Sequence, residues 1–166
     1  KIGVPGALQA CAYGVTNVII QASINSFGTD TAGGWAAYGK LDLIFWTVSS
    51  ALGVAVTTFV GQNYGAGKID RVYKSIRVNI GISYVFTGAI IIILYVFCAP
   101  LYHMFTTDPN VIQIGVYMIR FLIPSYLLSI LLVNLNGGLR GVGYVFWPTI
   151  FTFGGLFLIR LPWIMV

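Results

Sequence analysis

Long stretches almost without charge recur along the whole chain and limit what it can fold into. Five of them carry at most one charged residue each, with His103 counted as neutral, at residues 2–29, 41–60, 78–107, 109–139 and 141–166. A helix needs about 20 mostly apolar residues to cross the hydrocarbon core of a bilayer. We therefore predict an all-α, polytopic membrane helix bundle with five transmembrane helices, at about 4–27, 35–60, 75–99, 111–136 and 145–166.

The composition excludes an ordinary water-soluble domain. Charged residues make up 8% of the 166 residues, hydrophobic residues make up 58%, and the mean hydropathy is +0.89. A soluble domain carries charge on about a quarter of its residues. The first apolar stretch is too long and too polar for a signal peptide. Because the last predicted helix reaches Val166 without a flanking charge or turn, we expect the chain to be part of a larger protein.

Basic residues gather on one side of the predicted topology. Segment 61–77 contains four of the nine Lys and Arg residues, and Arg140 follows the fourth helix, whereas the opposite side has only Lys40. Since cytoplasmic loops are enriched in Lys and Arg, we predict that 61–77 is cytoplasmic and that the protein crosses the inner (plasma) membrane several times. The net charge of +5 then indicates contact with anionic membrane lipid and not with nucleic acid.

Enzymatic function is disfavoured by the side chains present. The two cysteines, Cys11 and Cys98, lie in different predicted helices, and His103 is the only histidine, so no zinc or haem ligand set can be assembled. The glycine-rich segment around Gly65 and Gly67 matches neither a Walker A loop nor a dinucleotide-binding fingerprint. We interpret it as a tight turn whose glycines permit positive φ and close approach to neighbouring loops.

A loop motif and five further motifs in register resemble the multidrug and toxic compound extrusion (MATE) family. The first is a loop motif made of Gly61, Gln62, Asn63, Gly65, Gly67 and Arg71. The others lie at the ends of predicted helices or within the last one: Pro5-Gly6-Ala7-Leu8-Gln9, Gln21-Ala22-Ser23-Ile24-Asn25-Ser26-Phe27-Gly28, Lys40-Leu41-Asp42, Leu139-Arg140-Gly141-Val142-Gly143 and Ile159-Arg160-Leu161-Pro162.

The resemblance implies a fold and an activity. The closing motifs are similar to the second lobe of that family, so residues 1–166 would form a partial C-terminal lobe containing the seventh to eleventh of twelve helices. It implies secondary active efflux of organic, often cationic, compounds by alternating access, coupled to Na⁺ or H⁺ influx, without a cofactor. The implied partners are membrane lipid, the missing N-terminal lobe and a small organic substrate.

Candidate cavity residues come from the first two predicted helices and the fourth. Gln9, Tyr13, Asn17, Gln21 and Asn25 recur every four residues and form one slowly winding polar stripe. Lipid cannot face such a stripe, so it either makes interhelical hydrogen bonds or lines a cavity for a ligand.

Three charged side chains lie inside predicted helices. Asp42 is the only carboxylate within a predicted span, which makes it a functional candidate, although with Lys40 it could also sit at the membrane interface. Arg120 and Arg160 either bind carbonyls freed by nearby prolines or pair with acids of the missing lobe. Several family members carry carboxylates in the first and fourth helices of this lobe. This chain has none there, so the resemblance places the coupling carboxylate in the missing lobe.

Aromatic side chains leave two interpretations open. Trp35, Tyr38, Phe45 and Trp46 cluster near the outer end of the second predicted helix, as an interfacial belt or as a site for cation–π capture.

Three functions remain: a drug or cation antiporter, a lipid or lipid-linked sugar flippase of the same superfamily, and a membrane scaffold subunit without transport. A flippase usually lines its cavity with several basic residues.

Overall fold

The computed structural model describes residues 3–154, and within them the chain is helical with short connections. Its six helices are α1 (Gly3–Ser26), α2 (Thr29–Gly65), α3 (Ile69–Val96), α4 (Cys98–His103), α5 (Pro109–Gly141) and α6 (Phe146–Gly154). Four helices are long and apolar enough to cross a membrane: Gly6–Ser26, Thr29–Gly65, Ile69–Val96 and Pro109–Gly141. The all-α membrane bundle is thus confirmed. Most of the fifth predicted helix, at 145–166, lies outside the described residues.

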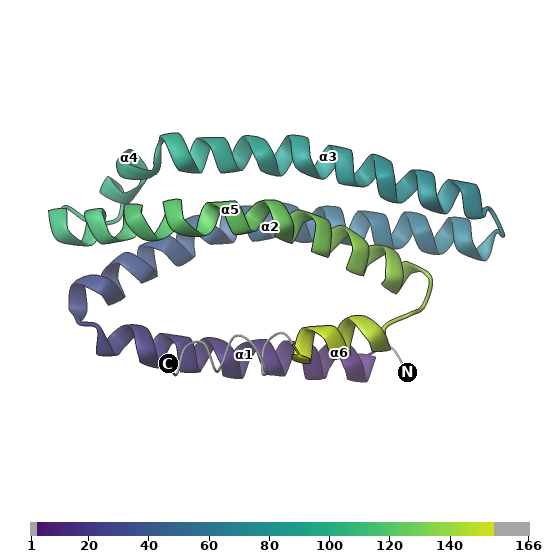
Figure 1. Cartoon of the computed structure of the whole chain (residues 1–166), viewed down its shortest axis with the longest axis horizontal. Helices are drawn as coiled ribbons and strands as arrows, with labels where there is room; N and C mark the ends of the chain where they lie inside the picture. Colours follow the sequence, from purple (N-terminus) through teal and green to yellow (C-terminus); the bar gives the residue numbers. More distant parts are fainter. Residues whose placement is uncertain (1–2, 155–166) are drawn as a thin grey trace.

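The helices form three layers, with α2 and α5 side by side in the middle (Figure 1). Helix α3 covers one side of this pair, and α1 packs beside α6 on the other. The α2–α3 and α5–α6 connections lie at the same end of the bundle as the first turn of α1 (Figure 1). We call it the basic end, because Lys68, Arg71 and Arg140 lie in or beside these connections.

The turn at the basic end is shorter than the sequence indicates. Helix α2 continues to Gly65 and α3 begins at Ile69, so most of the predicted loop 61–77 is helical. The chain reverses over three residues, where Lys68 N–H donates to the Asn63 carbonyl at 2.9 Å. Charge marks where a helix enters water, but the helix ends only where the backbone leaves helical dihedrals.

The two glycines of this turn differ, which corrects the expectation for Gly65. Gly67 has a φ of +70°, whereas Gly65 ends α2 with ordinary dihedrals. A Cβ on either residue would meet no atom of the described residues within 4 Å. Backbone conformation, and not close approach, is therefore what requires glycine, and it does so only at position 67.

We expect Gly67→Val to destabilise the full-length protein by about 1–3 kcal/mol, because a β-branched residue is strained at positive φ. Thermal unfolding in detergent measures the loss, and Gly65→Val is the matched control with a much smaller expected effect. Equal losses in the two variants would contradict the role given to φ at Gly67.

Glycines bring the backbones of α2 and α5 into contact. A Cβ built on Gly137 would lie 2.7 Å from the Gly53 carbonyl oxygen, and one built on Gly141 would lie 2.7 Å from the Thr57 carbonyl oxygen. The Thr57 hydroxyl lies 2.8 Å from the Gly53 carbonyl and 3.0 Å from the Gly137 carbonyl, and it bonds both. Small residues four apart allow this close packing in a membrane, where burial of apolar surface gives helices little reason to associate.

A buried amide network joins α3 to the same pair. Asn134 of α5 donates to the Ser83 hydroxyl at 3.0 Å and accepts from Asn79, which also donates to the Leu52 carbonyl of α2 at 3.1 Å. Asn134 is 1% exposed. Its polar atoms are hydrogen-bonded within the bundle, so this network holds three helices together and is not available to a ligand.

Candidate functional site: the Asp42 cavity

The polar stripe of α1 divides into parts with different contacts. Gln9 is buried, donates to the Thr152 hydroxyl at 2.6 Å and accepts from the Arg140 guanidinium at 2.6 Å. This contact ties α1, α5 and α6 together at the basic end and borders a pocket of about 400 Å³ that Tyr13 also lines. At the other end of α1, Gln21 donates to Asn25 at 2.9 Å, and both residues are exposed.

The middle of the stripe faces a second pocket, which we call the Asp42 cavity. Its volume is about 400 Å³. Helices α1, α2 and α5 form it, and its lining combines amides, hydroxyls, aromatic rings and one carboxylate: Asn17, Ile20, Gln21, Trp35, Tyr38, Gly39, Asp42, Trp46, Ser125, Tyr126 and Ser129. Asn25 is not part of this lining.

Asp42 is held by aromatic donors and points into the cavity. The Tyr126 hydroxyl donates to Asp42 Oδ1, and Trp46 makes a further side-chain hydrogen bond with Asp42. The Tyr38 side chain also forms a hydrogen bond with Asp42, and its hydroxyl lies 2.9 Å from that of Tyr126. These donors fix the orientation of the carboxylate while leaving it only half-buried.

Stacked rings hold these donors in place. The Phe45 ring stacks on Tyr126 with centroids 4.1 Å apart, and Trp35 stacks on Tyr38 at 5.0 Å. Phe45 is fully buried, so of the four clustered aromatic residues it belongs to the core, and Trp35, Tyr38 and Trp46 belong to the cavity wall. Electron-rich ring faces beside a carboxylate suit an organic cation.

Lys40 does not neutralise Asp42 within the described part of the chain. No salt bridge joins the two side chains, and residues two apart on a helix point to different faces. Within residues 3–154, no three His, Cys, Asp or Glu side chains gather, so a small cation at Asp42 would need hydroxyl and amide oxygens as its other ligands. Asn17, Gln21, Ser125 and Ser129 supply such oxygens in the same lining.

Arg120 lies elsewhere, which separates it from the other candidates. It is exposed, and its guanidinium carbon lies 5.4 Å from the centroid of the Tyr95 ring of α3. Position 120 is six residues before Tyr126, and this spacing turns a side chain about 120° away from the cavity face of α5. Arg160, the other arginine within a predicted helix, lies outside the described residues.

The loop motif is mainly structural where the structure describes it. Asn63 donates to the Phe59 carbonyl at 2.8 Å, Gln62 is exposed, and a Cβ on Gly61 would lie 3.3 Å from the Gly141 carbonyl oxygen. Gly65 and Gly67 form the turn described above. Asn63 and Arg71 also line a pocket, a groove between α2 and α3.

The α5 residues of the cavity were not expected from the sequence. Ser125, Tyr126 and Ser129 follow Pro124 in an otherwise apolar segment. Ser129 lies four residues after Ser125 and three after Tyr126, a spacing that places polar residues on one face of a membrane helix, and this spacing was the available signal. The spacing alone could not show that these α5 side chains lie next to Asp42.

Comparison with known proteins identifies the family of the chain. The MatE family model matches residues 5–166. The chain is 27% identical over 165 residues to the probable multidrug resistance protein YoeA of Bacillus subtilis, covering 98% of this chain and 35% of that protein. It is 28% identical over 163 residues to the probable multidrug resistance protein NorM of Thermotoga maritima, with the same two coverages, 98% and 35%.

A human protein is also similar. Multidrug and toxin extrusion protein 1 of Homo sapiens is 25% identical over 162 residues, which cover 98% of this chain and 28% of the human protein. The chain thus spans about a third of the length of these relatives, and the match extends over nearly all of it. The family match over residues 5–166 shows that the chain belongs to the MatE family, and its four long apolar helices fit a multi-pass membrane protein.

Proposed function

We propose that the full-length protein expels organic, often cationic compounds by alternating access, driven by inward movement of Na⁺ or H⁺. The observation that carries the proposal is the Asp42 cavity, where one oriented carboxylate lies among aromatic faces and neutral polar groups. Relatives named for multidrug resistance and for multidrug and toxin extrusion support the substrate class.

In this proposal residues 1–166 supply most of a C-terminal lobe, and the cavity is one wall of a larger chamber. An N-terminal lobe of the same protein supplies the opposite wall, together with a further coupling carboxylate. A lipid or lipid-linked sugar flippase is less well supported, because the described lining of the Asp42 cavity contains a carboxylate and neither Lys nor Arg.

Proteoliposomes containing the full-length protein test the function. A fluorescent organic cation such as ethidium should move against its gradient when an inward Na⁺ or H⁺ gradient is imposed, and should stop moving when the gradient is collapsed. Dye movement that does not depend on the Na⁺ gradient or the H⁺ gradient would contradict coupled efflux. Movement of a labelled phospholipid alone would favour a flippase, and no movement of either would favour a scaffold.

We also propose that the basic end faces the cytoplasm in the cell membrane, since most loop Lys and Arg residues of the described chain lie there. In a cysteine-free background, a cysteine at Ala66 should react with an impermeant maleimide only from the cytoplasmic side, and one at Thr107 only from outside. The reverse labelling pattern would overturn this orientation.

A further inference from the structure

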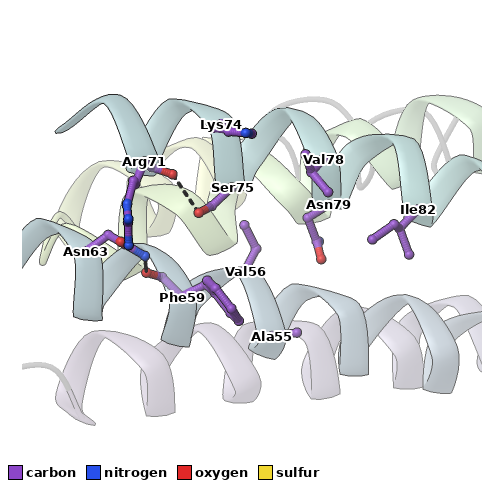
Figure 2. A pocket seen from close by; sticks show the side chains of 10 residues that line it. All are labelled: Ala55, Val56, Phe59, Asn63, Arg71, Lys74, Ser75, Val78, Asn79 and Ile82. Carbon is purple, nitrogen blue, oxygen red and sulfur yellow. Dashed lines mark hydrogen bonds between the residues drawn. The ribbon is translucent and has the colours of Figure 1, made fainter. Parts of the chain in front are cut away.

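A groove between α2 and α3 at the basic end is separate from the Asp42 cavity. Its volume is about 530 Å³. Figure 2 shows its lining, which is apolar over one part and polar over the other: Ala55, Val56, Phe59, Asn63, Arg71, Lys74, Ser75, Val78, Asn79 and Ile82. On α2, these residues lie on the face opposite Gly53 and Thr57, which border the Gln9 pocket.

The apolar part lies within two helices long and apolar enough to span the membrane. Phe59 is 61% exposed, Val78 51% and Ile82 40%, although each lies inside one of these two helices. Apolar side chains left open on a membrane helix contact acyl chains. A hydrocarbon chain can therefore lie in this part of the groove, between α2 and α3.

The polar part carries two positive charges without a counterion among the described residues. Figure 2 shows the Arg71 side chain reaching from α3 towards α2 beside Asn63. Neither Arg71 nor Lys74 forms a salt bridge with another residue in 3–154, and Asp70, beside Arg71, is exposed and pairs with neither. The positive charges of Arg71 and Lys74 thus lie at the membrane-surface end of an apolar groove.

The neutral polar groups of the groove already have partners. Asn63 donates to Phe59, Ser75 donates to the Arg71 carbonyl at 2.6 Å, and Asn79 donates to Leu52 and Asn134. Arg71 and Lys74 are therefore the groups available to a ligand. A guanidinium binds phosphate in a bidentate manner, and a lysine adds a mobile point charge.

We propose that this groove binds one anionic phospholipid from the leaflet at the basic end, with its phosphate at Arg71 and Lys74 and an acyl chain along Phe59, Val78 and Ile82. A soluble phosphate ester would share the headgroup chemistry but would leave the apolar part unused. Cationic residues beside a membrane span attract anionic lipid. The proposal concerns lipid binding and does not depend on the transport function proposed above.

Native mass spectrometry of the full-length protein in a neutral detergent tests it, with titration by dioleoyl phosphatidylglycerol. The double variant Arg71→Gln/Lys74→Gln should bind the first phosphatidylglycerol with affinity lower by roughly tenfold or more. The matched control Lys68→Gln/Arg77→Gln removes the same charge from residues outside the groove and should stay within about twofold of wild type. Equal losses in both variants would show general charge attraction and overturn the site.

Variants of the apolar part separate lipid from soluble phosphate. Ala55→Trp fills the groove without changing charge, and Val78→Phe is a second filling variant should the first not yield folded protein. Either should weaken phosphatidylglycerol binding several-fold, and glycerol 3-phosphate should not displace the lipid. If glycerol 3-phosphate displaces it and filling has no effect, the site binds soluble phosphates and the lipid proposal is wrong.

Discussion

Replacing Asp42 with asparagine in the full-length protein is expected to lower efflux of a cationic dye by about tenfold or more, with normal abundance in the membrane. Asparagine keeps the shape of the side chain and can still accept the Tyr126 hydrogen bond, but it removes the negative charge from the cavity. In a partly desolvated site, a lost attraction of about 1.4 kcal/mol already corresponds to tenfold. The dependence of efflux on pH or Na⁺ should shift as well.

Asp30 provides the control for this experiment. It lies in the first turn of α2, near the Thr29 hydroxyl, and is not part of the Asp42 cavity. Asp30→Asn should change neither the efflux rate nor its ion dependence. Should Asp42→Asn behave like Asp30→Asn, the carboxylate of Asp42 serves only the packing of α2 against α5 and this lobe contributes no coupling site.

The second large effect is expected from a single methyl group at Gly137. Gly137→Ala would place Cβ 2.6 Å from Val56 Cγ1 and 2.7 Å from the Gly53 carbonyl oxygen. The side chain of Val56 can rotate, but the backbone of α2 cannot move aside without separating the two central helices and breaking the Thr57 bridge. We expect a loss of about 1–3 kcal/mol in stability. Thermal unfolding of the purified full-length protein measures it.

Gly81→Ala is the matched control, because Gly81 lies inside α3 and a Cβ there would meet no atom of residues 3–154 within 4 Å. Alanine has the higher helix propensity, so this variant should be neutral or slightly stabilising. A loss at Gly81 as large as at Gly137 would show that helix flexibility, and not the contact between α2 and α5, is what glycine provides.

The sequence predicts the helices better than it predicts their neighbours. Charge-free length identifies the four described spans because a bilayer accepts few other structures. It misplaces the end of α2, since the residues after position 60 are polar yet remain helical. The α1 stripe was found by its spacing, but the same spacing cannot say that Gln9 would bond Arg140 while Asn17 faces a cavity.

Contacts between residues far apart in the chain could not be predicted from the sequence for the same reason. Asp42 and Tyr126 are 84 residues apart, and only the packing of α2 against α5 brings them together. That packing depends on where glycines permit contact. The pair Gly137 and Gly141 was a readable signal of it, but a small-residue pair does not identify the helix it will touch.

The Gln9 contact at the basic end consists of an amide, a hydroxyl and a guanidinium. None of these groups changes charge in the physiological pH range, so protons cannot release it directly. Among the described residues, Asp42, near the middle of the bundle, is the carboxylate that borders a cavity. Under the proposed function, an ion bound at Asp42 would therefore have to change the Gln9 contact by moving helices. The packed α2–α5 pair is the described element that reaches from Asp42 to that contact.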